Sequence, residues 1–504
     1  MAVNLDGNLS INDVVSIARG QSRVELGGEV RSRVIENRES LEEAIEKNEG
    51  PIYGVTTGFG ELVREEIPED QRRQLQVNLL KSHSAGVGDP FPEETVRGLI
   101  ALRANSLARG FSGVRLKLLN RLVDLLNKNV VPYVPSKGSV GASGDLIPLA
   151  HTASILIGEG KAYYEGELLS GEEALGRAGI QPVELREKEG LALINGTQVM
   201  TAVAAIAAAE ARRLIRLADL IASLTTYMVG GNFSQYDSRI YDLRPYEGQK
   251  KVAGNLRTLL GYEPSEYRPK NVQDPYSIRC IPQVHGGARS ALSHALDVIK
   301  TEINSVTDNP LVFDGSDSVI SGGNFHGEPV ALAADYLGMA LTELGNISER
   351  RVNRVLHPDL NGDLPAFLAD DPGTNSGFML AQYTSAALAS ENKSLSSPAS
   401  VDSIPVSGDQ EDHVSMGMHS ADNLEDIVEN VRNMLSAELL VAAQAGEYRE
   451  LDLTPPLRDL YDYLREVVPA IEQDRELSTL IDKTAELLKD EDLVDGLLEK
   501  YGIA

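Results

Sequence analysis

The sequence of 504 residues contains a single cysteine, Cys280, and has few positive charges for its size. One cysteine excludes an intramolecular disulfide framework and a multi-cysteine zinc site, and it fits a reducing compartment such as the cytoplasm. The 47 Lys and Arg against 75 Asp and Glu give a net charge of −28. This charge repels nucleic-acid phosphates and anionic lipids, so we expect neither a nucleic-acid nor a membrane partner. It suits a surface kept soluble in concentrated salt, or an ordinary acidic protein.

The sequence also lacks a recognisable export or membrane signal. Its start, MAVNLDGNLSINDVV, has no basic beginning and no apolar core of a signal peptide. Residues 190–209 carry no charge, which brings them near the length that spans a bilayer. They are rich in alanine, include Asn195, Thr197 and Gln198, and are followed at once by Glu210. We therefore expect a helix buried in a large bundle, and a cytoplasmic protein.

Motifs for common cofactors are missing as well. We find no dinucleotide-binding fingerprint, no lysine-centred cofactor motif and no cluster of metal ligands. The sequence therefore predicts no metal site and no external cofactor.

The pattern of residues changes near position 198. Residues 1–197 mix short helical stretches with many Gly and Pro, which predicts an irregular, loop-rich N-terminal lobe. Residues 198–504 contain long runs with helical periodicity, so we expect a mainly α fold with a long helical bundle that also mediates oligomerisation. Several runs are apolar on more than one face, which predicts packing against further copies of the chain. The expected helices are 201–228, 287–306, 329–356, 423–451 and a closing surface helix within 476–501.

The segment 138–145, GSVGASGD, places a serine between small residues in a turn-prone context. A hydrolase nucleophile elbow needs G-x-S-x-G, but the second glycine position after Ser143 is Asp145, so the spacing fails. By itself the segment is more typical of a tight or phosphate-binding turn than of a catalytic site.

Ala142-Ser143-Gly144, flanked by GSVG and DLIPLAH, resembles the signature of the aromatic amino-acid ammonia-lyase and aminomutase family. The resemblance implies that the tripeptide cyclises: the Gly144 nitrogen attacks the Ala142 carbonyl carbon, and loss of two waters leaves a methylidene-imidazolone (5-imidazolinone) containing Ser143 as 2,3-didehydroalanine. The residue types suit this reaction, because glycine permits a strained backbone approach and serine supplies the leaving hydroxyl. Such a ring is an electron sink that no natural side chain provides.

The similarity to this family extends along nearly the whole chain. YGVTTGFG, residues 53–60, is similar to the family's mobile loop, in which the tyrosine matching Tyr53 removes the substrate β-proton. A tyrosine with a pKa near 10 must be activated to act in this way. Arg279 would clamp the substrate carboxylate through its planar guanidinium. The resemblance places further substrate-pocket and cofactor-supporting residues at Asn195, Gln273, Tyr276 and Phe325.

Two positions indicate which amino acid is the substrate. Ser82-His83 is similar to the pair in histidine-specific members, whereas phenylalanine-specific members carry apolar residues there. Glu411 lies where histidine-specific members have an acidic residue. An imidazole can pair with both groups, and a phenyl ring would leave both unsatisfied. We therefore expect L-histidine as substrate and trans-urocanate as product. Glu411 would bind the imidazole or accept a proton, and the electrophile would capture the substrate through its amino group or its ring.

The resemblance further implies a helical bundle of the fumarase and aspartase type, a homotetramer, and active sites where subunits meet. Gly408-Asp409 departs from the Ala-Asn expected in many bacterial members, which affects local electrostatics only. A lyase or aminomutase acting on tyrosine or phenylalanine stays open as an alternative. So does a non-catalytic helical scaffold, although both Ser143 and Tyr53 are present.

Overall fold

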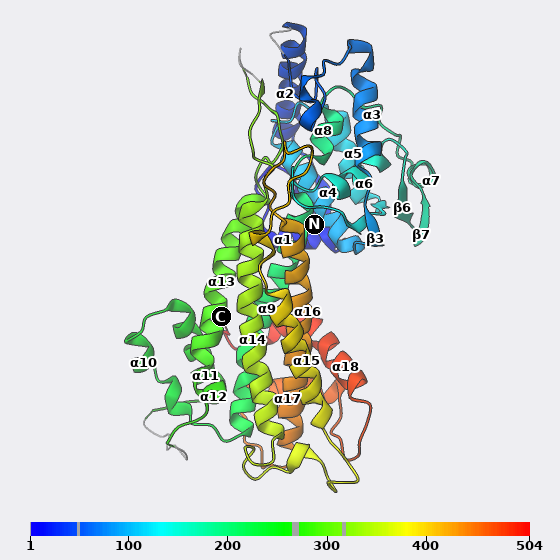
Figure 1. The fold of residues 1–504 in the computed structure, drawn as a ribbon. Coiled ribbons are helices and arrows are strands. Elements are labelled where there is room, and N and C mark those ends of the chain that lie inside the picture. Colours follow the sequence, from blue (N-terminus) through cyan, green and yellow to red (C-terminus); the bar gives the residue numbers. More distant parts are fainter. Residues whose placement is uncertain (1, 48–50, 265–271, 315–318, 504) are drawn as a thin grey trace. The chain divides into compact units, whose positions relative to one another are not determined.

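The chain forms two compact units in a computed structural model that describes residues 2–47, 51–264, 272–314 and 319–503. Unit 1 comprises residues 1–209, 295–335 and 398–422, and unit 2 comprises the remaining segments 210–294, 336–397 and 423–504. Helices dominate both units, which confirms the expected mainly α fold (Figure 1). The division after residue 197 stays a prediction. The chain passes between the units within α9 (Gln198–Met228), α13 (Ile281–Glu302), α14 (Glu328–Leu356) and α16 (Gly417–Gly446).

Unit 1 combines short helices, small sheets and long loops. Its α5 shows why such segments become helices, since buried leucines recur every three to four residues, from Leu118 to Leu126, and form one apolar face. Its other helices include α4, which is buried along most of its length. The helices of unit 1 are α1 (Ile11–Ala18), α2 (Gly28–Lys47), α3 (Arg72–His83), α4 (Glu93–Ala108), α5 (Leu116–Asn127), α6 (Leu146–Leu156), α7 (Gly171–Arg177), α8 (Glu189–Ile194), and the 3-10 turns η1 (Gly60–Arg64), η2 (Glu69–Gln71) and η5 (Ala399–Val401).

The strands of unit 1 are short and form four small sheets among the described residues. The largest has the order β4-β6-β7 and is antiparallel, while β1 pairs with β2 in parallel. The other two sheets are the antiparallel pairs β3-β5 and β8-β9. The strands are β1 (Ala2–Asn4), β2 (Arg23–Glu25), β3 (Val87–Pro90), β4 (Val131–Pro132), β5 (Pro135–Lys137), β6 (Lys161–Tyr164), β7 (Glu167–Ser170), β8 (Leu311–Val312) and β9 (Val319–Ile320).

Unit 2 is a bundle in which the long helices run alongside one another (Figure 1). The sequence predicts four of them, but α15 lies between predicted helices and was missed. The expected closing helix is two helices, because Asp490 adopts an extended conformation between them and its side chain accepts a hydrogen bond from Leu493 N. The remaining elements of unit 2 are η3 (Phe233–Tyr236), α10 (Ser238–Asp242), α11 (Glu247–Leu260), α12 (Tyr276–Arg279), η4 (Ala366–Leu368), α15 (Met379–Leu395), α17 (Pro455–Val467), α18 (Leu477–Lys489) and α19 (Glu491–Lys500).

The core of unit 2 contains a buried ion pair between α14 and α16. The Nε and one terminal nitrogen of Arg351 donate to the two carboxylate oxygens of Glu438 at 2.6 and 2.9 Å. Thr225 and Ser348 donate to the same carboxylate at 2.8 and 2.6 Å. Both charged side chains are almost fully buried. The pair is therefore fully hydrogen-bonded, which is the condition under which buried charges are tolerated.

Glu438→Gln is expected to lower the free energy of unfolding by about 3–5 kcal/mol, because it leaves the buried Arg351 without a counter-charge. Urea denaturation at fixed protein concentration measures the effect. Glu486→Gln is the matched control: Glu486 is exposed and pairs with Lys489 on the surface. Its expected change is within about 0.5 kcal/mol. Equal changes in the two variants would contradict the prediction.

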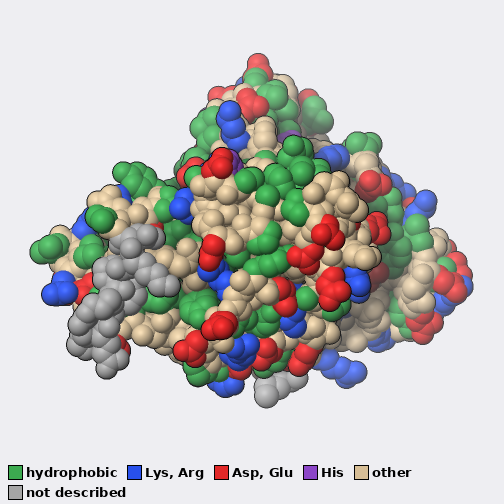
Figure 2. Space-filling model, turned by 90° about the horizontal axis from the view of Figure 1, so that it is seen from below, with side chains coloured by type: hydrophobic (Ala, Val, Ile, Leu, Met, Phe, Trp, Pro, Cys, Tyr) green, Lys and Arg blue, Asp and Glu red, His purple; other side chains and the backbone are tan. Residues whose placement is uncertain are grey.

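The uncharged stretch 190–209 does not form one continuous helix. It is divided by a break at residues 195–197, between α8 and α9. Within the part of the chain that the structure describes, we find no helix with the length and hydropathy needed to cross a bilayer. On the face in Figure 2, acidic side chains are spread among basic and apolar ones, as the acidic composition predicts.

Candidate active site

The predicted cofactor tripeptide forms a tight turn just before α6. A backbone bridge pairs Ala142 with Gly144, and a second bridge pairs Gly144 with Gly196. Gly144 has a φ of +68°, and a Cβ there would lie 2.1 Å from the Gly196 carbonyl oxygen. Only glycine therefore fits position 144, for its conformation and for the close approach. Ala142 packs with Val414 in a small buried cluster behind the turn.

Asp145 fastens this turn to the beginning of α9. Its carboxylate accepts hydrogen bonds from Val199 N at 3.0 Å and Met200 N at 2.9 Å, and from Ser139 Oγ at 3.0 Å. Its own N–H donates to the Gly196 carbonyl at 2.7 Å. Burial raises the pKa of Asp145 to about 6, against the opposing effect of these hydrogen bonds. The Asp145 carboxylate thus caps the beginning of α9, and its backbone N–H ties the end of the turn to Gly196.

Ser143 lies at the tip of the turn and is only partly buried. Its hydroxyl donates to Asn195 Oδ1 at 2.6 Å. The Asn195 side chain is itself oriented, because its Nδ2 donates to the Asn309 carbonyl at 3.0 Å. The backbone carbonyl of Asn195 accepts from the fully buried Arg103 at 2.9 Å. The structure therefore brings two predicted residues, Ser143 and Asn195, into direct contact.

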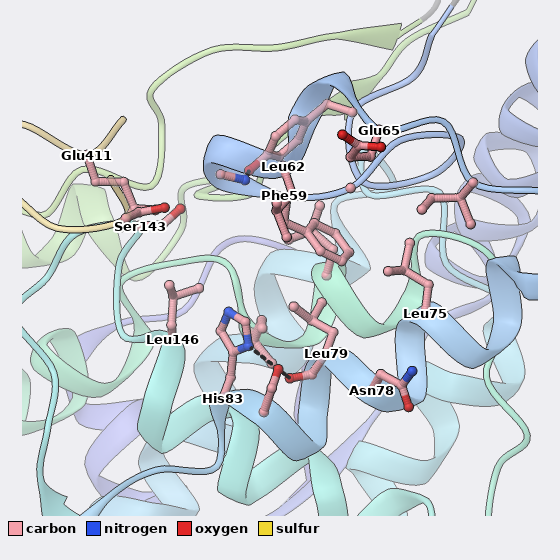
Figure 3. A pocket seen from close by; sticks show the side chains of 18 residues that line it. Phe59, Leu62, Glu65, Leu75, Asn78, Leu79, His83, Ser143, Leu146 and Glu411 are labelled. Atoms are coloured by element: carbon pink, nitrogen blue, oxygen red, sulfur yellow. Dashed lines mark hydrogen bonds between the residues drawn. The ribbon is translucent and has the colours of Figure 1, made fainter. Parts of the chain in front are cut away.

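Ser143 faces a cavity of about 460 Å³, a volume in the range of small-molecule sites. Figure 3 shows Ser143 and Glu411 at one end of it, with His83 and Leu146 below, and Glu65, Leu75 and Asn78 toward the other end. The lining residues are Tyr53, Gly58, Phe59, Gly60, Leu62, Glu65, Ile67, Leu75, Asn78, Leu79, Ser82, His83, Ser143, Leu146, Leu191, Ile194, Ser407 and Glu411. Four predicted residues, Tyr53, His83, Ser143 and Glu411, thus share one cavity within unit 1.

The hydroxyl of Tyr53 accepts a hydrogen bond from Gly60 N at 3.0 Å. The tyrosine ring meets Phe59 edge-on, with ring centroids 6.3 Å apart. Burial raises the pKa of Tyr53 above its usual 10, the Gly60 hydrogen bond lowers it, and the charge of Glu411 raises it further. In the free chain Tyr53 is therefore protonated near neutrality, and a role as base requires activation.

His83 and Glu411 are the polar groups expected to choose the substrate. Burial lowers the pKa of His83, so its ring is neutral near pH 7, with one nitrogen as donor and one as acceptor. Its Nδ1 lies 3.0 Å from Ser82 Oγ. Burial also raises the pKa of Glu411. The cavity therefore offers both hydrogen-bond donors and hydrogen-bond acceptors between largely apolar walls.

Ala142, Gly144 and Asn195 hold Ser143 without lining the cavity, and four further predicted residues do not line it either. Phe325 belongs to unit 1 but does not line the cavity. Gln273, Tyr276 and Arg279 belong to unit 2, where the Arg279 guanidinium lies 4.9 Å from the centre of the Tyr276 ring. Their roles in binding substrate stay predictions.

Sequence reasoning missed much of the cavity wall. Leu75, Asn78 and Leu79 lie on the same helix as His83 and line the cavity with it. Counted from Leu75, their spacing of three, four and eight residues is the signal that could have found them, because such residues share a helix face. Phe59 shows no such spacing, since it lies in an irregular loop, but it belongs to the segment 53–60 that resembles the family's mobile loop.

His326, Glu328 and His413 form a further cluster, with ligand atoms within 4.8 Å of one another. The Nδ1 of His326 accepts a hydrogen bond from Glu328 N at 3.3 Å, so a neutral ring carries its proton on Nε2. That Nε2 lies 3.4 Å from His413 Nδ1. The two rings are tilted by 30° with their centroids 5.4 Å apart, so they lie within hydrogen-bond distance of each other.

The helical fold, and the cavity that Ser143 of the Ala-Ser-Gly turn lines together with Tyr53, agree with the sequence resemblance. The sequence model of the aromatic amino acid lyases matches residues 9–466. The chain belongs to this family.

Curated relatives and solved structures refine the comparison. The chain is 47% identical to histidine ammonia-lyase of Natranaerobius thermophilus, over 99% of both chains. It matches the crystal structure of histidine ammonia-lyase from Trypanosoma cruzi with a TM-score of 0.93 and 41% identity, covering 99% of this chain and 96% of that one. Tyrosine aminomutase from Streptomyces globisporus gives the same TM-score at 38% identity, with 99% of both chains covered.

Proposed function

We propose that this chain is a carbon–nitrogen lyase that eliminates ammonia from L-histidine and releases trans-urocanate, the first step of histidine breakdown. The observation that carries the proposal is the cavity in which Ser143 of the Ala-Ser-Gly turn faces Tyr53, His83 and Glu411. The full-length similarity to histidine ammonia-lyases supports the choice of substrate.

Residues 142–144 fit the cofactor that the family forms from its own backbone. Ala142 and Gly144 are already paired across Ser143, as ring closure requires, and Gly144 has no Cβ in the way. Attack of the Gly144 nitrogen on the Ala142 carbonyl carbon forms one C–N bond. The carbonyl oxygen leaves as water with the hydrogens of the Gly144 and Ser143 N–H groups, and a C=N bond forms between the Ala142 carbon and the Ser143 nitrogen. The Ser143 hydroxyl leaves with the α-hydrogen as the second water. The resulting methylidene-imidazolone supplies an electron sink for the elimination, with no external cofactor.

The side chains around the turn bind the substrate and move its proton. Tyr53 accepts the β-proton after losing its own, and the Gly60 N–H stabilises the tyrosinate form. Asn195 and Arg279 hold the substrate carboxylate, Arg279 through two parallel hydrogen bonds. Gln273, Tyr276 and Phe325 complete the walls around the substrate. Fixing the α-carbon in this way aims the β-hydrogen at Tyr53.

Recognition of the imidazole falls to His83 and Glu411. Neutral His83 can donate to or accept from an imidazole nitrogen, and the Glu411 carboxylate accepts from the imidazole N–H. A phenyl or phenol ring leaves at least one of these partly buried groups unpaired, which costs about 1–3 kcal/mol. Histidine is therefore favoured over phenylalanine and tyrosine.

The rival function is a tyrosine aminomutase, since such an enzyme has the same TM-score. The purified chain is mixed in parallel with L-histidine, L-tyrosine or L-phenylalanine, in low and in high salt. Absorbance in the urocanate band is followed, and products are separated by chromatography. Urocanate from histidine, with little product from the other two, supports the proposal. Coumarate, cinnamate or a β-amino acid instead overturns the choice of substrate or of reaction, and silence with all three favours a scaffold.

Glu411→Gln is expected to shift the rising limb of the pH–rate profile to lower pH. The charge of Glu411 raises the pKa of Tyr53, so its removal lowers that pKa and makes the tyrosinate available earlier. The variant also loses an imidazole acceptor, so kcat/KM for histidine at the optimum falls by about 10-fold or more. Initial rates across pH measure both effects. A limb that moves to higher pH would rule out this coupling.

We also propose a cytoplasmic homotetramer. Exposed apolar side chains on α14 and α15 in unit 2, among them Tyr336, Met339, Leu380 and Tyr383, support packing against other copies. In such an assembly Phe325, Gln273, Tyr276 and Arg279 of neighbouring copies would complete each site, so a monomer is expected to be inactive. Light scattering should give four times the chain mass of 54.5 kDa.

A further inference from the structure

Gln76 on α3 is a fully buried side chain whose amide joins three segments of unit 1. Its Oε1 accepts hydrogen bonds from Gly190 N at 2.9 Å and Leu191 N at 3.2 Å. Its Nε2 donates to the Gly54 carbonyl at 3.2 Å. The amide therefore connects α3 both to the beginning of α8 and to the peptide that follows Tyr53.

The bond to α8 provides a helix cap that α8 lacks. Lys188 occupies the cap position in a left-handed conformation and makes no side-chain cap bond. Its ammonium is instead bound to Asp308 at 2.7 Å, with both side chains fully buried. The first N–H groups of a helix need an acceptor, and here Gln76 supplies it from another helix.

The position of α8 determines where Asn195 lies. This helix is short, and Asn195 caps its C-terminal end. A Cβ on Gly190 would lie 2.8 Å from the Gln76 carbonyl oxygen, so α3 and α8 approach closely at this point. Fixing the beginning of so short a helix therefore fixes Asn195, which holds Ser143.

The bond to Gly54 fixes the segment that carries Tyr53. Gly54 has a φ of +65°, and a Cβ there would lie 2.5 Å from the side chain of Leu191, so the segment is packed on α8. Beyond Gly54 the loop is held by hydrogen bonds within residues 52–67. Gln76 is thus bonded to both the Tyr53 segment and the Asn195 helix. Along the same helix, Leu75, Leu79 and His83 face the cavity (Figure 3).

We propose that Gln76 is a positioning residue for the elimination, because it fixes the position of Tyr53 relative to Asn195 and Ser143. This inference rests on the proposed function. Gln76 touches no substrate, and it acts through the two segments that it joins. A shift of about 1 Å in a reacting group costs up to about 100-fold in rate. Displacement of Tyr53 relative to Asn195 and Ser143 should therefore lower kcat far more than it changes KM.

Gln76→Glu separates the two bonds at pH values where the carboxyl is ionised, because a carboxylate keeps the acceptor for α8 but loses the donor to Gly54. Gln76→Met has a similar volume and removes all three bonds. Gln71→Glu, at an exposed position just before the same helix, is the matched control. Three measurements are made on each intact chain: steady-state kinetics with histidine, hydrogen exchange of residues 53–60, and the mass loss of two waters that reports cofactor formation.

We expect Gln76→Glu to lower kcat by about 10-fold or more, with a smaller change in KM. Exchange in residues 53–60 should become faster, and the mass loss should remain. Gln71→Glu should match the parent in all three. Unchanged kcat in Gln76→Glu, with or without faster exchange, overturns the inference, and so does an equal loss in Gln71→Glu. If the parent itself does not turn over histidine, the proposed function fails, and faster exchange in Gln76→Glu alone still supports the tie between Gln76 and the Tyr53 segment.

Discussion

A Ser143→Ala chain is expected to lose ammonia elimination from histidine by about 10³-fold or more, on the scale seen when a covalent catalytic group is removed. The Ser143 hydroxyl is the only leaving group in residues 142–144, so its loss prevents formation of the methylidene. The remaining side chains of the cavity offer acids, bases and hydrogen bonds but no electron sink. Urocanate release measures the rate. Intact mass spectrometry tests the cause: the parent should be lighter than its sequence by two waters, and the variant by one at most.

A structural explanation of such a loss can be tested separately. In the uncyclised chain the Ser143 hydroxyl donates a hydrogen bond to Asn195, which contributes about 0.5–1.5 kcal/mol, and cyclisation removes this hydroxyl from the parent as well. That change is too small to unfold the chain, so thermal unfolding should move by only a few degrees. Ser136→Ala, at a partly buried position before the turn, is the control and should keep both the activity and the mass loss. A Ser143→Ala chain with parental activity would refute the self-made cofactor.

The sequence predicts the local chemistry of the site well where residues are close in the chain. The turn at residues 142–144 could be predicted from its run of small residues alone, because Gly144 has no Cβ and can adopt the positive φ that the turn requires. The long helices were predicted because their apolar periodicity is strong, as in α9 and α14. The break at Asp490 was not predicted, because one capping residue outweighs a periodicity that continues on both sides.

The contacts between distant segments could not be predicted from periodicity. Ser143 and Asn195 are 52 positions apart, and Gln76 and Gly190 are 114 apart. Their pairing depends on how α3, α6 and α8 pack, which no short window of sequence records. Gln76 itself looks like an ordinary polar helix residue until its burial is known. The hydrogen bonds from this buried amide to three backbone groups depend on tertiary packing, so they are visible only in the structure.

The family resemblance predicted site residues that hydrophobic periodicity could not identify. It placed Tyr53, His83 and Glu411 together, and the structure has all three lining one cavity. It also assigned Arg279 to the substrate carboxylate, but Arg279 belongs to unit 2 and the residues that line the cavity belong to unit 1. A proposed homotetramer accounts for this difference, because a site completed by neighbouring copies leaves each single chain with only part of its groups.

Tyr53→Phe is expected to lower kcat by about 10²–10⁴-fold, the range for removal of a general base, with little change in KM. The change removes one hydroxyl and its hydrogen bond from Gly60, while the ring contact with Phe59 can remain. Because Tyr53 takes no part in ring closure, the variant should keep the mass loss of two waters, unlike Ser143→Ala.

The pH profile gives this prediction its sharpest test. Burial raises the pKa of Tyr53 above 10, so proton removal by tyrosinate should make the parent rate rise with pH on the acid side of its optimum. In Tyr53→Phe that dependence should disappear along with most of the rate. Tyr246→Phe, at an exposed tyrosine of unit 2, is the control and should match the parent. A Tyr53→Phe chain that keeps both the mass loss and the parental pH-dependent rate would exclude Tyr53 as the base, and Glu411 would then be the next residue to test.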